Sequence, residues 1–274
     1  MIDWENLTSL PAWAVMWGIS FALYGLLKVV SWSAGPTAAP VWKHVGYLLA
    51  WPGMDARAFL GDATPALRRP TGREWGFACL KLGFGCGLTW GLAPVIAARN
   101  ERLAGWVGMV GIIFVLHFGI FHLLSCAWRR NGVVAVPMMN WPIASQSLTE
   151  FWGRRWNLAF RDLTHRFLFQ PLLRRLGPTG SLLVGFLVSG VIHDLVISVP
   201  AQGGYGLPTL FFTLQGFAIL LERSRWGRRI GLGSGLIGRL YCVIIIALPC
   251  PLLFHPAFVC RVIVPFLTAI GALQ

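Results

Sequence analysis

A histidine and an aspartate, His193 and Asp194, stand side by side in a run that is otherwise apolar from residue 181 to residue 199. A charged side chain at the centre of a bilayer costs about 2.5–3.5 kcal/mol on insertion scales, so such residues are rare and usually functional. An imidazole exchanges protons near neutral pH, and an adjacent acid can orient it. The pair predicts proton-transfer chemistry inside a membrane. The alternative is a hydrogen bond that only joins two helices.

The segment around this pair has a small-residue stripe. Its members are spaced four apart: Ser181, Gly185, Ser189 and His193. On a helix they share one face, and small residues there let a neighbouring helix approach closely. We therefore expect His193 to face the protein interior, roughly 20 Å along the helix from residue 180 and past the midplane. Asp194 lies about 100° further around the helix.

A second candidate region precedes this segment, between residues 128 and 179. It contains a capping box, Ser147-Leu-Thr-Glu150, where a helix is expected to begin. Apolar and charged residues then occupy opposite faces: Trp152, Trp156, Ala159, Phe160, Leu163 and Phe167 against Glu150, Arg154, Arg161 and His165. This pattern predicts one basic amphipathic helix in the membrane interface. Asn157 falls at the edge of its polar face.

The composition indicates the class of protein. The chain of 274 residues is 56% hydrophobic and 12% charged, whereas about 25% charged residues is usual in soluble domains. We therefore expect a single membrane domain over residues 1–274. The cysteines all lie in apolar runs without metal-ligand spacing: Cys79, Cys86, Cys126, Cys242, Cys250 and Cys260. We expect no metal site and no cofactor.

The apolar runs predict about seven transmembrane helices, because a span needs about 20 apolar residues and only helices or closed barrels cross lipid. The runs are 12–32, 75–97, 104–127, 180–199, 207–222, 236–253 and 256–272. The fifth and the last are short, and the last two flank a Pro-containing turn at 254–256 and could form a re-entrant pair. The expected fold is all-α and polytopic, with an additional amphipathic interfacial helix.

The basic residues predict the orientation. One side of the membrane would carry nearly all of them: Lys43, Arg57, Arg68, Arg69, Arg73, Arg129, Arg130, Arg154, Arg155, Arg161, Arg166, Arg174, Arg175, Arg223, Arg225, Arg228 and Arg229. The other would carry Arg99 and Arg102. The first side is expected to be cytoplasmic and the N-terminus external. We therefore attribute the net charge of +13 to membrane topology and contact with anionic lipid rather than to binding of nucleic acid. With Asp3 and Glu5 ahead of it and no basic residue, the first run is expected to remain as a span.

Other polar residues inside the runs have simpler expected roles. His117 and His122 are five apart, which favours packing or lining of a substrate chamber over metal binding. Glu222 shares a face with Gln215 and could pair with an arginine of the following cluster. Lys28 is expected to snorkel towards the interface.

Two motifs together resemble a known family. "SLTEFWGRRWN" at 147–157, followed by "SGVIHDL" at 189–195, resembles the wax-synthase branch of the membrane-bound O-acyltransferases. Three weaker resemblances, "YLLAWPGMD" at 47–55, "LHFGIFHLL" at 116–124 and "FFTLQGFAILLE" at 211–222, extend the similar region to residues 45–225. Asp194 stands where this branch more often has Glu.

The resemblance implies an activity and site residues. The activity is transfer of a fatty acyl group from an acyl thioester, acyl-CoA, to a lipophilic alcohol, giving a wax-type ester at the lipid bilayer. His193 would be catalytic, with Asn157 beside it in the reaction chamber, and the absence of a nucleophilic serine motif is compatible with direct transfer. The candidate substrate-binding residues are Trp152, Trp156, Arg154, Arg155 and Asp194. For the arginines, which suit phosphates, plain interfacial anchoring is the alternative.

Two other functions remain open. One is O-acylation of an exported glycan or another lipid, and the second is proton-coupled transport with His193 and Asp194 as a relay. The second is disfavoured because no internal repeat is visible. The predominance of Arg over Lys suggests a bacterium and hence the inner membrane; otherwise the endoplasmic reticulum is expected.

Overall fold

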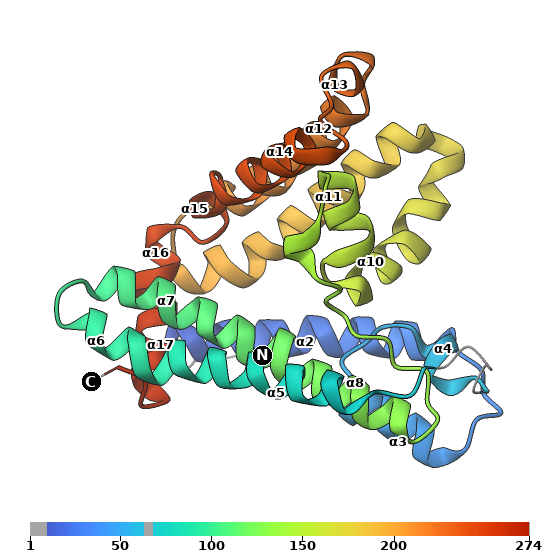
Figure 1. Cartoon of the computed structure of the whole chain (residues 1–274), viewed down its shortest axis with the longest axis horizontal. Helices are drawn as coiled ribbons and strands as arrows, with labels where there is room; N and C mark the ends of the chain where they lie inside the picture. Colours follow the sequence, from blue (N-terminus) through green and yellow to red (C-terminus); the bar gives the residue numbers. More distant parts are fainter. Residues whose placement is uncertain (1–9, 63–67, 274) are drawn as a thin grey trace, which may run out of the picture.

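The computed structural model describes residues 10–62 and 68–273. These residues form helices joined by turns and loops, and no strand occurs among them (Figure 1). The all-α prediction is confirmed. It follows from the continuous apolar runs, because a helix satisfies its backbone hydrogen bonds within one segment. Asp3 and Glu5, which supported the prediction of a retained first span, lie outside the described residues.

The first half of the chain forms the lower layer of Figure 1. Its helices are α2 (Ala12–Ser33), α3 (Val41–Ala50), α4 (Ala56–Leu60), α5 (Gly72–Cys86), α6 (Ala93–Ala97), α7 (Glu101–Ile113) and α8 (Phe121–Arg130), with the π-helical segments η1 (Gly87–Leu92) and η2 (Phe114–Ile120). Gly85 and Gly111 allow close packing here, because a Cβ on Gly85 would meet the Val115 nitrogen at 2.7 Å. The small residues bring these helices backbone to backbone.

The second half begins and ends with short segments, and its longest helices, α11 and α12, lie between them. In chain order these are η3 (Pro142–Ala144), α9 (Leu148–Glu150), η4 (Phe151–Arg155), α10 (Leu158–Thr164), η5 (His165–Phe169), α11 (Gln170–Ala201), α12 (Leu207–Arg223), α13 (Arg225–Arg229), α14 (Gly235–Ala247), α15 (Cys250–Leu253), α16 (Pro256–Phe258), η6 (Val259–Ile263) and α17 (Val264–Ala269). Figure 1 shows α12 and α14 side by side in an arm that reaches α13 at its tip.

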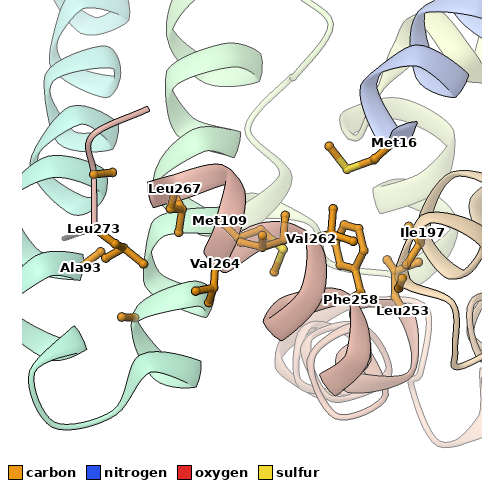
Figure 2. Close-up of a cluster of buried hydrophobic side chains, with 14 of the residues drawn as sticks. Met16, Ala93, Met109, Ile197, Leu253, Phe258, Val262, Val264, Leu267 and Leu273 are labelled. Carbon is orange, nitrogen blue, oxygen red and sulfur yellow. The ribbon is translucent and has the colours of Figure 1, made fainter. Parts of the chain in front are cut away.

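The largest buried cluster joins the two halves. Val262, Val264 and Leu267 of η6 and α17 contact α7 through Met109 and the C-terminal part of α11 through Ile197 (Figure 2). The C-terminal helices therefore pack inside the bundle, between the lower layer and α11.

Among residues 10–62 and 68–273, five helical stretches are long and apolar enough to cross a membrane. They are Ala12–Ser33, Gly72–Ala97, Glu101–Arg130, Leu158–Ala201 and Gly235–Leu253. The other two predicted spans are also helical, but shorter: α12 has 17 residues and the last forms the short apolar helix Pro256–Ala269. The protein is therefore a multi-pass integral membrane protein, and the count of seven spans stays a prediction.

The single amphipathic helix expected from Ser147 is broken in the structure. Helix α9 continues into η4, which ends at Arg155, and Asn157 adopts a left-handed conformation (φ 42°, ψ 61°) before α10 begins. The break occurs because the backbone pairs with another segment: Leu158 N donates to Met138 O at 2.9 Å, and Asn140 N donates to Arg155 O at 2.8 Å. A continuous helix would lose both bonds.

Lys28 was wrongly expected to snorkel. Its side chain is 2% exposed, and Nζ donates to Trp51 O and Gly53 O while lying 3.5 Å from the centre of the Tyr47 ring. This amine holds the turn of the "YLLAWPGMD" stretch against α2. Its carbonyl and ring partners replace the water that a snorkelling amine would reach.

Candidate active site

His193 lies near the C-terminal end of α11. This helix is kinked at Gly177, whose left-handed backbone (φ 66°) precedes Pro178, and it continues from there to Ala201. Glycine and proline together explain the kink, since glycine accepts a positive φ and proline starts a helix readily. The kink separates the first turns of α11, before Gly177, from the part that carries His193.

The imidazole of His193 is held in one orientation. Its Nδ1 lies 2.6 Å from Ser189 O, one turn earlier, and its ring centre is 4.3 Å from that of Phe212 on α12. A carbonyl oxygen only accepts hydrogen bonds, so Nδ1 carries the proton in the neutral ring. The lone pair then resides on Nε2, which can act as a base.

Asp194 joins α11 to the start of α12. Its Oδ1 accepts from Ser198 Oγ at 2.8 Å and from Gly206 N at 2.9 Å, and Oδ2 accepts from the Thr209 backbone N at 3.1 Å and from its hydroxyl. Both carboxylate oxygens are thus used within the protein. The structure places Asp194 as an N-terminal cap of α12; its predicted contact with substrate is untested.

The same network reaches a third helix through His255. His255 Nδ1 accepts from Phe258 N at 3.2 Å and caps α16, so the proton of the neutral ring lies on Nε2. Nε2 lies 3.3 Å from Ser198 Oγ, whose hydroxyl donates to Asp194. His255 is 1% exposed. A chain of hydrogen bonds therefore connects α16, α11 and α12 next to His193.

Helices α11 and α12 approach closely at Gly190. A Cβ there would lie 2.7 Å from the Thr209 Cα. Gly190 lies on the same side of α11 as Asp194, whereas Gly185 of the predicted stripe faces Thr164 of α10, with a built Cβ 3.7 Å from the Thr164 methyl group. Gly185 therefore faces α10, whereas His193 of the same stripe lies against Phe212 of α12, next to the close contact at Gly190.

The motif at 147–157 packs against the same part of α12. The Trp152 ring lies 5.8 Å from that of Phe212, and its Nε1 donates to Gln215 Oε1 at 3.3 Å. Gln215 is fully buried and also donates to Ile245 O on α14. Phe212 thus contacts both Trp152 and His193, and it joins the two sequence motifs in space.

Glu222 anchors the start of this motif. Its carboxylate is buried and accepts from Leu148 N at 2.6 Å and from Thr149 N at 3.2 Å. These are first-turn donors of α9, which have no partner within the helix. The predicted pairing of Glu222 with a neighbouring arginine is not the interaction that the structure shows.

The capping box at Ser147 is confirmed in part. Ser147 Oγ accepts from Glu150 N at 3.0 Å, but the Glu150 carboxylate bonds Gln146 N at 2.8 Å, one residue before the cap. This bond and the ion pair with Arg155, at 2.6 Å, lower the pKa of the Glu150 carboxyl. The acid therefore closes the first turn in its charged form.

Asn157 lies directly after the motif's break. Its side-chain Oδ1 accepts from Phe160 N at 3.5 Å and caps α10, and its backbone N lies 3.3 Å from Met139 Sδ. No hydrogen bond joins Asn157 to His193 within the described chain. The side-chain amide nitrogen of Asn157, Nδ2, can still donate a hydrogen bond.

The candidate arginines differ in their surroundings. Arg154 is exposed. Arg155 pairs with Glu150 and also donates to Asn140 O and Trp141 O. Its guanidinium is thus engaged in holding the loop. Arg161, also on the polar side, pairs with Asp162 and donates to Gly153 O at 2.8 Å.

Trp156 lies between the motif and the lower layer. Its ring stacks on Phe151 at 5.5 Å and lies 6.3 Å from Phe118 of η2. Trp152 and Trp156 therefore point towards different helices, α12 and η2. Trp152, and not Trp156, lies beside Phe212, whose ring packs against that of His193.

One cluster of possible metal ligands occurs among the residues described, at Glu74, His122 and Cys126, with ligand atoms within 4.8 Å of one another. His122 Nε2 lies 3.1 Å from Glu74, while Lys81 Nζ lies 2.7 Å from His122 Nδ1. Arg129 pairs with Glu74 as well. Two cations already face these groups, which therefore form an ion-pair network between α5 and α8.

Sequence reasoning placed Gln215 and Glu222 on one face but missed Phe212 and the partners that these residues contact. Phe212, Gln215, Ile219 and Glu222 follow one face of α12 at helical spacing, and all are buried. That spacing indicates a packed face, but it does not identify the segment that packs on it. The Ser198–His255 contact joins residues too far apart in sequence for any local pattern to signal.

Comparison with known proteins finds relatives for this part of the chain. Residues 135–214 match the membrane bound O-acyl transferase family. A long-chain-alcohol O-fatty-acyltransferase of Simmondsia chinensis is 38% identical over 132 residues, which are 42% of this chain and 37% of that protein. An acyl-CoA–sterol O-acyltransferase 1 of Arabidopsis thaliana is 30% identical over 130 residues, 44% of this chain and 38% of that protein. A probable long-chain-alcohol O-fatty-acyltransferase 9 of the same plant is 30% identical over 136 residues, covering 45% and 40%. The chain therefore spans about two fifths of these relatives.

Proposed function

Since residues 135–214 match the membrane bound O-acyl transferase family, we propose that this chain belongs to the wax-synthase-like branch of that superfamily and transfers an acyl group from acyl-CoA to the hydroxyl of a lipophilic alcohol. The observation that carries the proposal is the His193 imidazole. Its Nδ1 proton is held by Ser189 O, which leaves Nε2 as a base.

The reaction needs no covalent enzyme intermediate. His193 Nε2 takes the proton of the alcohol as its oxygen bonds to the thioester carbon. The tetrahedral oxyanion then collapses, the carbon–sulfur bond breaks, and the leaving thiolate takes the proton from Nε2. Base assistance of this kind contributes about 10²–10⁴-fold in rate. The products are an ester and free CoA, and no cofactor is required.

Other residues are assigned supporting roles. The Asn157 amide would donate to the oxyanion or hold the thioester carbonyl. Trp152 would wall the site, because it contacts Phe212 beside His193. Asp194, with both oxygens bonded internally, would act by fixing α11 against α12. The exposed Arg154 would contact the acyl donor, and Trp156 would lie further along the motif.

The membrane placement suits both substrates. An acyl chain and a lipophilic alcohol partition into lipid, whereas CoA remains in water. We infer that the arginine-rich loops are cytoplasmic and the N-terminus external, because Lys and Arg mark cytoplasmic loops. The membrane would be the inner membrane in a bacterium and the endoplasmic reticulum otherwise, and residues 45–225 would carry the catalytic core of one domain.

The test is ester formation by intact membranes. Wild type, His193→Ala and His165→Ala are expressed in a host without neutral-lipid acyltransferases and supplied with labelled fatty acid and hexadecanol or a sterol. His165 is an exposed histidine of η5 and serves as the matched control. We expect labelled ester from wild type and from the control, and none from His193→Ala at equal abundance.

The other outcomes separate the alternatives. Ester from His193→Ala would remove His193 from the chemistry. Ester from none of the three, with labelled acyl groups on a glycan instead, would favour the second acceptor class. Proton flux without any acyl product would favour the transporter.

A further inference from the structure

An open pocket of about 510 Å³ lies where the end of α12 meets the start of α9 and the loop before α14. It is lined by Ser147, Thr149, Glu222, Arg223, Arg228, Gly231, Gly233 and Ser234. Small-molecule sites commonly have volumes of about 300–1,000 Å³. The pocket is therefore large enough for a charged group of moderate size.

The exposed charged side chains of its walls are arginines. Arg223 and Arg228 are exposed, and neither forms an ion pair within residues 10–62 and 68–273. Arg223 Nε donates to Thr149 Oγ1 at 3.2 Å, which fixes its guanidinium at the rim. The single acid of the walls, Glu222, already accepts two backbone N–H groups. Guanidinium and hydroxyl donors together suit phosphate oxygens.

The position of the pocket relates it to His193. Phe212, which touches the imidazole, and Arg223 lie on the same helix, about 16 Å apart at about 1.5 Å per residue. The pantetheine arm of CoA has about the length of four extended residues, which is roughly 14 Å. A donor with its thioester at His193 would therefore bring its phosphates to this end of α12.

We propose that Arg223 and Arg228 form a phosphate-binding site for the acyl donor. The inference rests on the proposed function and specifies the arginines that bind the donor. Arg155 is excluded from this role because Glu150 and two carbonyl groups occupy its guanidinium. A phospholipid headgroup offers the same phosphate chemistry, and the experiment distinguishes the two sources.

The experiment compares two double variants of the purified full-length protein in detergent. Arg223→Gln with Arg228→Gln removes the pocket's cations. Arg225→Gln with Arg229→Gln removes two exposed arginines of α13 that do not line the pocket, with the same change in net charge. Binding of unacylated CoA is measured by calorimetry, which requires no ester formation. Charge-assisted hydrogen bonds of this kind correspond to a loss of about 10–100-fold in affinity for the first variant, and the control should change little.

Enzyme assays and lipid binding complete the test. With acyl-CoA, the pocket variant should show a raised KM and an unchanged kcat, whereas an S-acyl pantetheine without phosphate should serve it as well as wild type. Unchanged CoA binding with loss of binding to phosphatidylglycerol vesicles would overturn the donor assignment in favour of a lipid headgroup. Equal effects in both double variants, or none in either, would overturn the site. Because CoA binding is measured separately, a failure of ester formation would count against the proposed function alone.

Discussion

At the residue scale, the environment of His193 assigns its two nitrogens different tasks. Ser189 O holds Nδ1, and Phe212 supports the ring, so the basic nitrogen has a fixed direction. The adjacent acid does not touch the imidazole through a hydrogen bond; it acts on the helices instead. The imidazole is therefore oriented by backbone and packing rather than by a carboxylate partner.

His255 is expected to position this site through Ser198. Glutamine places its amide nitrogen near the position of Nε2, and asparagine places its polar atoms near Nδ1. His255→Gln should therefore keep the bond to Ser198 and most of the activity. His255→Asn should keep the cap of α16 and its thermal stability but lower kcat by about 10–100-fold, the scale of a small misplacement of reacting groups.

The measurement is the rate of ester formation per amount of membrane protein, with thermal unfolding recorded on the same samples. Activity that follows stability in both variants would mean that His255 supports the fold alone.

At the scale of elements, the motif at 147–157 is shaped by partners outside it. Glu222 of α12 holds its start, and the backbone of residues 138–140 holds its end. Asn157 tolerates the left-handed conformation between them better than most residues do. The break divides what would be one interfacial helix, and the segment before the break packs against α12.

Replacement of Glu222 by glutamine should destabilise the protein. Glutamine keeps one accepting oxygen, so one first-turn N–H of α9 would lose its partner, at a cost of about 1–3 kcal/mol. We expect a lower Tm for Glu222→Gln in detergent. Glu101→Gln, an exposed first-turn acid of α7, makes the same charge change and should have little effect. Equal Tm values for the two variants would contradict the anchoring role of Glu222.

At the scale of the whole molecule, the arrangement of arginines and spans predicts a single orientation. The exposed Arg225 begins α13, in the connection after α12, while the exposed Arg102 lies near the start of α7, beside the connection before it. These two connections carry very different amounts of positive charge. The rule for cytoplasmic loops therefore places them on opposite sides.

Cysteine labelling tests this orientation. In a variant whose native cysteines are replaced by serine or alanine, Arg102→Cys should react with an impermeant maleimide in intact cells. Arg225→Cys should react only after the membrane is permeabilised. Labelling of both positions from outside would show that the number of spans between them is even, and the predicted topology would be wrong.

The sequence by itself determined the class of protein, the all-α fold and the two motifs that the comparisons support. These follow from local properties: runs of apolar residues long enough for lipid, and a histidine on a face of small residues. Only the tertiary structure decided that the motif breaks at Asn157, that Asp194 caps α12, and that Glu222 binds backbone N–H groups rather than arginine. Each of these depends on a hydrogen-bond partner from another element. Burial makes an unsatisfied polar group costly, so the partner that the fold supplies, and not the local pattern, determines what such a side chain does.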